Sequence, residues 1–205
     1  KTFSMENVMG IFNQNAATHQ EKPNCEYLED LMASLVWMGY QVRLHIVNAR
    51  NYEVAQDRWR VILFAAQAGY EIPRMRMMLS PRVMTTKEAI GKFEHIEPVH
   101  EGGLVLAGGR RRISHHDQRR KDENRPEFRL DGSRPAGTLL CKRPIWHYSR
   151  NRLITNRERA CLQSFPESYF FCGKLADVTQ QIGNAVPVNL AAAIGKAILD
   201  CFKRD

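Results

Sequence analysis

Apolar residues recur at helical spacing in two stretches of this chain. The first covers residues 26–38 and is followed by Gly39, which takes the position of a C-cap glycine. The second follows Pro187, a residue suited to the first turn of a helix. Its apolar stripe is made of Leu190, Ile194, Ile198 and Phe202. Both patterns predict helices with one buried face.

A further helix is predicted from its capping signal. Thr155 followed three residues later by Glu158 is a capping box. The helix should end near Ser164, because the residue before a proline avoids the helical region. Further on, Gly183-Asn184 predicts a tight turn at the mouth of the last helix, where backbone amides and an amide side chain can face a ligand. An ordinary loop that enters a core helix explains the same pattern.

Strand patterns occupy the first third of the chain. Apolar or alternating runs predict strands at residues 2–5, 41–47 and 59–65. Between residues 73 and 150 both periodicities fade, while Arg, His, Gly, Pro and Ser become frequent. This change of composition predicts a separate, irregular segment inside a regular domain.

Composition limits the classes of function. The chain has 205 residues, a net charge of +8, a pI near 9.4 and 43% hydrophobic residues, which is enough for a core. The positive charge favours a polyanionic partner such as nucleic acid, although a basic and inert surface fits it equally well. No apolar run reaches the ~18 residues of a membrane span, and the first residues lack a signal-peptide pattern. Five cysteines at scattered spacing favour reduced thiols in an intracellular setting.

Four blocks of the sequence resemble DNA (cytosine-5) methyltransferases. Arg157-Glu158 with Gln163-Ser164-Phe165-Pro166, and then the run Gln-Ile-Gly-Asn-Ala-Val-Pro at 181–187, look like the last two conserved blocks of that family. Residues 52–60 resemble its Tyr-x-Val-x-Gln-x-Arg-x-Arg block, and Glu6-Asn7-Val8 resembles its Glu-Asn-Val block. The likeness covers both ends of the chain and hardly the middle.

The resemblance implies an α/β fold, namely the second half of a Rossmann-like S-adenosylmethionine-dependent methyltransferase domain. It implies a methyltransferase core at 1–72, a small irregular target-recognition domain inserted at 73–150, and a return to the core with a closing helix at 151–205. It also implies S-adenosyl-L-methionine as the cofactor and double-stranded DNA as the partner. The style of the segment near residue 140 looks fungal or otherwise eukaryotic, which predicts a nuclear location.

The same resemblance assigns roles to single residues. Glu6 would engage N3 and the exocyclic amine of the target cytosine, which makes C6 more electrophilic. Arg60 would hold the cytosine O2, and Arg58 would have a phosphate-binding or supporting role. The two arginines alternate along an extended chain and therefore face the same side. Asn184 and the backbone of Val186 would close the donor pocket. The alternative is a surface glutamate and two solvated arginines without a shared function.

The irregular segment carries the residues expected to touch DNA. A basic, glycine-containing loop is suited to phosphate contacts, and its basic residues are Arg110, Arg111, Arg112, Arg119, Arg120 and Lys121. Thr138, in a Thr-Leu pair, resembles a family position near the flipped base. His115-His116-Asp117 does not predict a metal site, since adjacent histidines ligate one ion poorly and no cysteine pair lies at zinc spacing. Trp146 and Tyr148 are expected to pack rather than stack on bases.

Two parts of the family's chemistry are missing from the sequence. The nucleophilic cysteine belongs to a Pro-Cys-Gln block upstream of the Glu-Asn-Val block, and no cysteine here has that setting. No Gly-x-Gly follows a strand to hold the methyl donor. The chain begins at Lys1 without an initiator Met, so we expect it to be the later part of a longer or two-chain enzyme, inactive alone. A non-catalytic DNA-binding or stimulating relative, and a generic basic DNA-binding module, are the alternatives.

Overall fold

A three-stranded antiparallel sheet forms the centre of the molecule. The computed structural model describes residues 1–12, 26–76, 82–95, 129–140 and 144–202. The strands are β1 (Thr2–Val8), β2 (Tyr40–Asn48) and β3 (Trp59–Gln67), in the order β1-β3-β2. β3 pairs with both neighbours, with Glu6 opposite Ile62 and His45 opposite the same residue. β3 is accordingly the buried centre of the sheet, and its side chains from 61 to 66 are fully buried.

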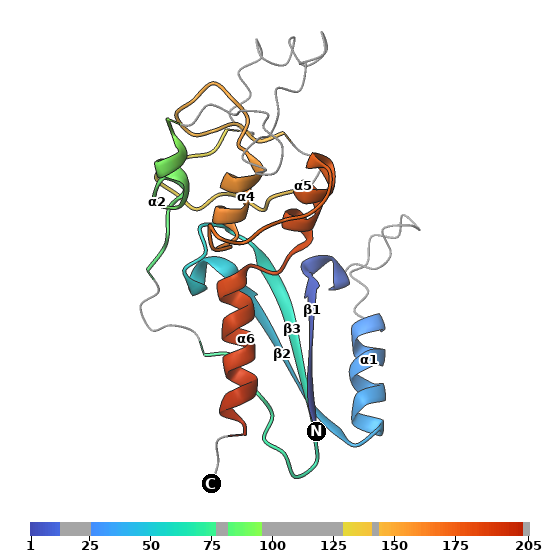
Figure 1. Ribbon diagram of the computed structural model, residues 1–205. Helices are drawn as coiled ribbons and strands as arrows, with labels where there is room; N and C mark the ends of the chain where they lie inside the picture. Colours follow the sequence, from blue (N-terminus) through green and yellow to red (C-terminus); the bar gives the residue numbers. More distant parts are fainter. Residues whose placement is uncertain (13–25, 77–81, 96–128, 141–143, 203–205) are drawn as a thin grey trace.

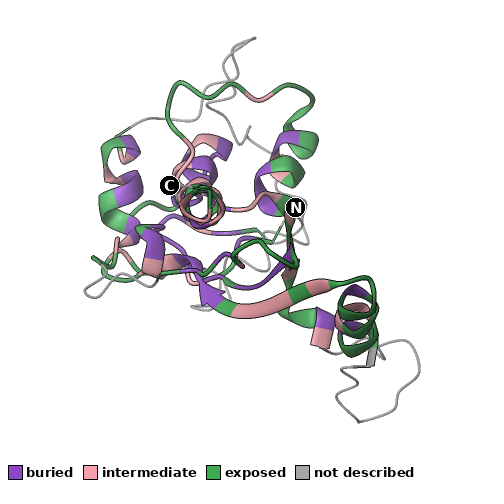
Figure 2. Cartoon of the chain, turned by 90° about the horizontal axis from the view of Figure 1, so that it is seen from below, coloured by how far each residue is buried: buried purple, intermediate pink, exposed green. Residues whose placement is uncertain are grey.

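One helix covers each face of the sheet (Figure 1). Successive strand residues point to opposite faces, so β3 supplies both cores. Val61, Leu63 and Ala65 pack with α1 (Glu26–Trp37), whereas Ile62 and Phe64 pack with α6 (Val188–Asp200). In Figure 2 the helix α1 is exposed over most of its surface, and the burial of the sheet is concentrated on β3. The continuous apolar run of β3 is explained by this burial on both faces.

A second group of short elements lies beyond the carboxyl end of β1 (Figure 1). It contains α2 (Thr86–Ile90), η3 (Gly91–Phe93), α4 (Asn156–Leu162) and α5 (Leu175–Asn184). A cluster of buried apolar side chains from α2, α4 and the segments between them fills its interior. Two short 3-10 helices, η1 (Met9–Phe12) and η2 (Ala49–Tyr52), lie at the ends of β1 and β2. These connections place α4 and α5 next to the end of the sheet that carries the predicted site.

Most of the predicted elements are confirmed, with small shifts of their ends. The helix predicted at 26–38 is α1, and Gly39 has a φ of +82°, which suits a glycine after a helix. The capping box of Thr155 and Glu158 is present in full at the start of α4. The mixed α/β composition is confirmed as well. The inserted domain at 73–150 stays a prediction.

Two local predictions are wrong. The first strand does not stop at residue 5, because Val8 still pairs with Arg60 of β3, so Glu6 lies inside the strand. Gly183-Asn184 does not form a turn at the mouth of the last helix; both residues belong to the end of α5. Pro187 is the N-cap residue of α6, one position before the predicted first turn. The chain links α5 to α6 through Ala185, Val186 and Pro187.

No single helix among the described residues is long and apolar enough to span a membrane. α5 and α6 reach that length and apolar character only when taken together, and they are bent by 41° at their junction.

Candidate functional site

Glu6 and Arg60 form an ion pair between neighbouring strands. Glu6 faces Ile62 across the ladder and Val8 faces Arg60, so the register puts Glu6 and Arg60 two positions apart on one face of the sheet. The distance from Glu6 Oε1 to Arg60 Nε is 2.6 Å. The exposed fraction is 24% for the Glu6 side chain and 7% for that of Arg60. The structure therefore brings together the two residues predicted to hold the base.

The guanidinium of Arg60 is held through two of its nitrogens, Nε and Nη1. Nη1 donates to the carbonyl oxygen of Trp59 at 2.7 Å. Within the described part of the chain, no hydrogen bond engages Nη2. Burial lowers the pKa of Arg60, and the charge and hydrogen bonding of Glu6 oppose that shift. An arginine stays protonated at neutral pH under such a shift, so the pair presents a carboxyl group beside a positive charge.

Arg58 lies just before β3 and has a different environment from Arg60. It is 3% exposed. Its Nη2 donates to the carbonyl oxygens of Gly183 at 2.8 Å and Ala185 at 3.2 Å. Nη1 donates to Gln56 Oε1 at 3.3 Å. Of the two roles expected for Arg58, the contacts match the supporting one, because the side chain is turned to backbone carbonyls instead of solvent.

The end of α5 and the α5–α6 connection carry the two residues predicted to meet the methyl donor. Asn184 is exposed at the end of α5, and Val186 is half-buried and packs against the core beneath α6. The first backbone amides of α6 already have partners within the chain. Val188 N donates to the Gln163 carbonyl at 3.1 Å, and Asn189 N donates to Ser164 Oγ at 3.0 Å. The start of α6 is therefore already capped.

Sequence reasoning missed the roles of Gln163 and Ser164. Both stand in the block that carries the family resemblance, and the resemblance assigns neither of them a role. Ser164 has a left-handed backbone with φ of +58°, which orients its hydroxyl toward α6. The Gln163 side-chain amide donates to the carbonyl of Ile182 in α5. A polar Gln-Ser pair just before Pro166 was the available signal, since such residues cap nearby helices.

Thr138 contacts the segment just before β3. Its Oγ1 donates to the carbonyl oxygen of Asp57 at 3.0 Å, and its side chain is exposed. The next residue, Leu139, is buried and its amide donates to Gln56 Oε1 at 3.3 Å. Gln56 was missed as a functional residue, although it belongs to the recognised Gln-x-Arg-x-Arg block. It ties the Thr-Leu segment to Arg58.

The basic residues 110–112 and 119–121, together with His115-His116-Asp117, lie outside the described residues. Among the residues that the structure describes, no group of His, Cys, Asp or Glu side chains is arranged to hold a metal ion.

Tyr148 stacks on His147, with ring centroids 4.4 Å apart, and its hydroxyl donates to Glu94 Oε2 at 3.0 Å. The Trp146 ring lies beneath Arg129. Both aromatic residues are engaged in packing.

A buried polar cluster organises the entry to α4. Arg152 donates to both carboxylate oxygens of Glu158 at 2.8 Å, and Thr155 N donates to Oε2 at 2.7 Å. His147 Nε2 lies 3.4 Å from Glu158 Oε1, and both side chains are fully buried. Burial lowers the pKa of His147, partly offset by Glu158. This cluster joins the segment before α4 to the helix itself.

The described cysteines are Cys161, Cys172 and Cys201, and all three are free thiols. Burial raises the pKa of the Cys161 thiol, which disfavours the thiolate. Cys172 is exposed, and Cys201 Sγ donates to the carbonyl of Ala197. Cys25 and Cys141 lie outside the described residues.

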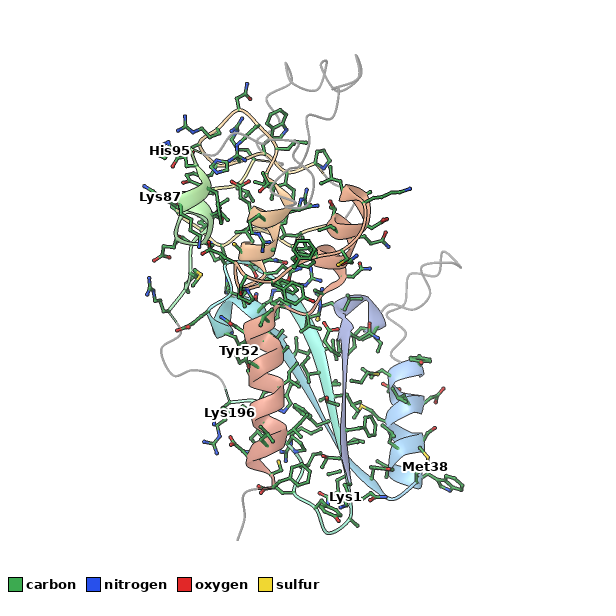
Figure 3. All side chains as sticks on the ribbon, viewed as in Figure 1. Lys1, Met38, Tyr52, Lys87, His95 and Lys196 are labelled. Atoms are coloured by element: carbon green, nitrogen blue, oxygen red, sulfur yellow. The ribbon has the colours of Figure 1, made fainter. Side chains whose placement is uncertain are left out.

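A groove of about 440 Å³ runs beside α6. Tyr52 and Lys196, on the same side of that helix in Figure 3, are among its lining residues. None of the predicted site residues lines it.

Comparison with known proteins gives the family. The model of the C-5 cytosine-specific DNA methylases matches residues 1–103 and 101–200. The type II methyltransferase M.PspPI of a Psychrobacter species is 46% identical and is aligned over 97% of this chain and 54% of its own length. M1.HphI of Haemophilus parahaemolyticus is 30% identical, over 97% of this chain and 56% of its own. The chain thus spans about half the length of the curated relatives it matches.

Solved structures share the fold. An E. coli protein described as a DNA modification methyltransferase encoded within a prophage superposes with a TM-score of 0.70 at 20% identity, over 99% of this chain and 70% of its own. The Dnmt2 methyltransferase of S. pombe has a TM-score of 0.64 at 14% identity, over 99% and 67%.

These relatives correct one prediction. The nuclear location, and the eukaryotic style on which it rested, are wrong, because the relatives found by sequence are bacterial type II methyltransferases. A short stretch of recognition-region sequence carried that prediction, and such stretches vary within a family more than the blocks around the site do. The blocks themselves led to the right group: this chain belongs to the C-5 cytosine-specific DNA methylase family.

Proposed function

We propose that this chain is the base-holding half of a DNA (cytosine-5) methyltransferase. The whole enzyme transfers a methyl group from S-adenosyl-L-methionine to C5 of a cytosine flipped out of duplex DNA, since that atom cannot be attacked inside the base stack. The observation that carries the proposal is the Glu6–Arg60 pair, with 2.6 Å between Oε1 and Nε. A carboxyl group beside a guanidinium is complementary to the N3, amine and O2 edge of cytosine.

In this mechanism Glu6 engages N3 and the exocyclic amine, and Arg60 holds O2. Both contacts withdraw electron density from the ring and make C6 more electrophilic. The low exposure of Arg60 strengthens its interaction with a developing negative charge, because water screens it little. The bond from Nη1 to the Trp59 carbonyl fixes the guanidinium before the base arrives, so little reorganisation is needed.

The residues present fit part of a methyl-donor pocket. C-5 DNA methyltransferases use S-adenosyl-L-methionine, which supplies an electrophilic methyl group when bound. Asn184 is exposed and Val186 is half-buried, and we assign both to one wall of this pocket. The amides of Val188 and Asn189 are not part of it, because they are already bonded to Gln163 and Ser164. The remaining walls belong to the upstream half.

DNA contacts are proposed for the segment between β3 and α4. Its inserted recognition domain, at 73–150, positions the duplex, and the basic residues at 110–112 and 119–121 contact phosphates. Thr138 reaches the flipped base from this segment. The bond of its hydroxyl to the Asp57 carbonyl supports that role, since it anchors Thr138 to a residue only three positions before Arg60 in the chain.

The upstream half is proposed to join along β1. In the described structure β1 pairs with β3 alone, so its second edge has unused backbone groups. The chain covers only about half of its curated relatives. The nucleophilic cysteine and most of the donor pocket would come from that half, in the same chain or in another.

The test measures methyl transfer from labelled S-adenosyl-L-methionine to cytosine-containing duplex DNA. This chain is assayed alone and with its upstream half added in trans or in cis. We expect transfer only when both halves are present. Glu6→Gln, which keeps the shape of the side chain, should then lower the rate by about 10²–10⁴-fold, the usual contribution of a general acid.

Glu29→Gln is the matched control, because Glu29 is exposed on the outer side of α1. Its rate should equal that of the wild type. DNA binding without methyl transfer in every combination would leave a non-catalytic DNA-binding relative and refute the proposal.

A further inference from the structure

A buried pair of polar side chains lies where three parts of the proposed site meet. Gln56 is fully buried and Arg58 is 3% exposed. The two are joined by the bond from Arg58 Nη1 to Gln56 Oε1 at 3.3 Å. A buried guanidinium is costly unless its donors are used, so the partners of this pair show what its position serves.

Arg58 bonds the backbone carbonyl groups on both sides of Asn184. Its Nη2 bonds the carbonyls of Gly183 and Ala185, the residues that flank Asn184 in sequence. From the opposite side, the Gln163 side chain holds the carbonyl of Ile182. A planar guanidinium presents its donors in fixed directions. The peptide groups around Asn184 are thus oriented by side chains from another element before any ligand binds.

Gln56 and Arg58 are also connected to the base-holding residues and to the Thr138-Leu139 segment. Arg60 is two residues from Arg58 in the chain, and it carries the ion pair to Glu6. Gln56 Oε1 accepts the amide of Leu139 at 3.3 Å, next to Thr138. A single connected set of bonds and neighbouring residues therefore links the proposed donor wall, the base-holding strand and the recognition segment.

We propose that Arg58 is a positioning residue for the methyl donor: it holds residues 183–186, at the end of α5 and in the connection to α6, in the shape that binds S-adenosyl-L-methionine, and Gln56 aligns its guanidinium. This rests on the proposed function. Arg58 directs its donors to Gln56 and to backbone carbonyls, and its side chain has almost no exposed surface. Its loss therefore weakens donor binding and leaves DNA affinity intact, a split that a general packing role does not produce.

The experiment uses the assembled enzyme with both halves, carrying Arg58→Met or Arg58→Lys. Calorimetry gives the Kd for S-adenosyl-L-methionine, and fluorescence anisotropy gives the Kd for duplex DNA. We expect Arg58→Met to raise the donor Kd about 10- to 100-fold, the effect of losing bonds from a charged donor. Arg58→Lys should lie between Arg58→Met and the wild type, because an ammonium group lacks the planar fork.

Hydrogen exchange supplies a readout that needs no bound cofactor. In the cofactor-free enzyme, the peptide covering residues 182–188 should exchange faster in Arg58→Met than in the wild type. Peptides from α1 should be unchanged. Faster exchange confined to the connection is the direct sign that Arg58 holds it in place.

Arg43→Met is the matched control. Arg43 also donates to two neighbouring carbonyls, but these are the carbonyls of Ile72 at 3.1 Å and Pro73 at 3.4 Å, far in sequence from residues 183–186. The control removes the same kind of bond from the same protein. Its donor Kd should equal that of the wild type, with any effect confined to Tm.

The outcomes separate this inference from the proposed function. A wild-type assembly that transfers no methyl group refutes the proposed function. An active wild type whose Arg58 variants keep the wild-type donor Kd refutes only the positioning role. Equal losses of donor and DNA affinity would also refute it, since they indicate general unfolding. If Arg58→Met does not fold, the donor Kd and DNA Kd of Arg58→Lys provide the test, because this variant retains the buried charge.

Discussion

At the scale of single residues, buried charge is found with a partner. Arg58, Arg60 and Glu158 have almost no exposed surface, and each is bonded to a charge or to carbonyls. Alternation along the chain predicts that Arg58 and Arg60 share a face. It does not predict that one turns to a glutamate and the other to the α5–α6 connection. Those partners lie far away in sequence and become neighbours only through the fold.

His147 gives a prediction on pH at this scale. Burial lowers the pKa of His147, so the folded protein favours the neutral ring. An unfolded histidine titrates near pH 6.5. The stability that depends on the neutral ring is therefore present above that pH and is lost as the pH falls below it toward the folded pKa, because the unfolded chain then binds the proton more readily. The Tm should fall between about pH 7.5 and about pH 5.

His147→Asn should reduce that fall. An asparagine oxygen can replace Nδ1 as the acceptor for Ser149 N and Arg150 N, now at 3.2 and 3.3 Å. Burial, with Arg43 and Arg74, also lowers the pKa of His45, which leaves a residual slope of the same sign. Thermal unfolding at several pH values is the measurement, and equal slopes for wild type and variant would contradict the prediction.

At the scale of elements, short sequence signals predict those helix ends that are stabilised by interactions between residues close in sequence. Gly39 and the Thr155 capping box marked helix ends correctly because their cause lies within a few residues. α5 was missed although Leu175, Val178 and Ile182 have helical spacing. Its N-cap is Lys174, which lacks the usual short polar side chain. α2 was missed inside a segment predicted to be irregular, although Thr85 and Glu88 form a second capping box.

The two capping boxes give a matched prediction. At α4 the box is buried, with Glu158 also bonded by Arg152, whereas at α2 Glu88 is exposed. Thr155→Ala should cost about 1–2 kcal/mol and Thr85→Ala about 0.5–1 kcal/mol, because water replaces the exposed cap more readily. Urea unfolding of both variants measures the difference. Equal costs would show that burial does not strengthen the cap.

At the scale of the whole molecule, the sequence predicts strands and leaves their order open. Thr2 pairs with Ala66 and Gln41 pairs with the same residue, and no local pattern specifies such distant partners. The family resemblance supplied the site residues, whereas the antiparallel order β1-β3-β2 became visible only in the structure. Within the described residues, that order leaves one open edge on β1 and one on β2.

The two edges are expected to respond differently to the upstream half. Backbone amides of β1 that point away from β3 should exchange rapidly in this chain alone and slowly in the assembled enzyme. Those of β2 that point away from β3 should exchange rapidly in both, because β2 is the outer strand of the assembly. Hydrogen exchange followed for both strands is the measurement. Protection of β2 instead of β1 would overturn the proposed mode of assembly.

The central position of β3 also has a consequence during synthesis on the ribosome. Fifty residues separate the end of β1 at Val8 from the start of β3 at Trp59. At roughly 5–20 residues per second, β1 is complete for about 3–10 s before its partner strand begins to emerge. β2 and β3, joined by a short connection, can pair almost at once. Translation order thus makes β1 wait for β3, whereas β2 can pair with β3 as soon as both have emerged.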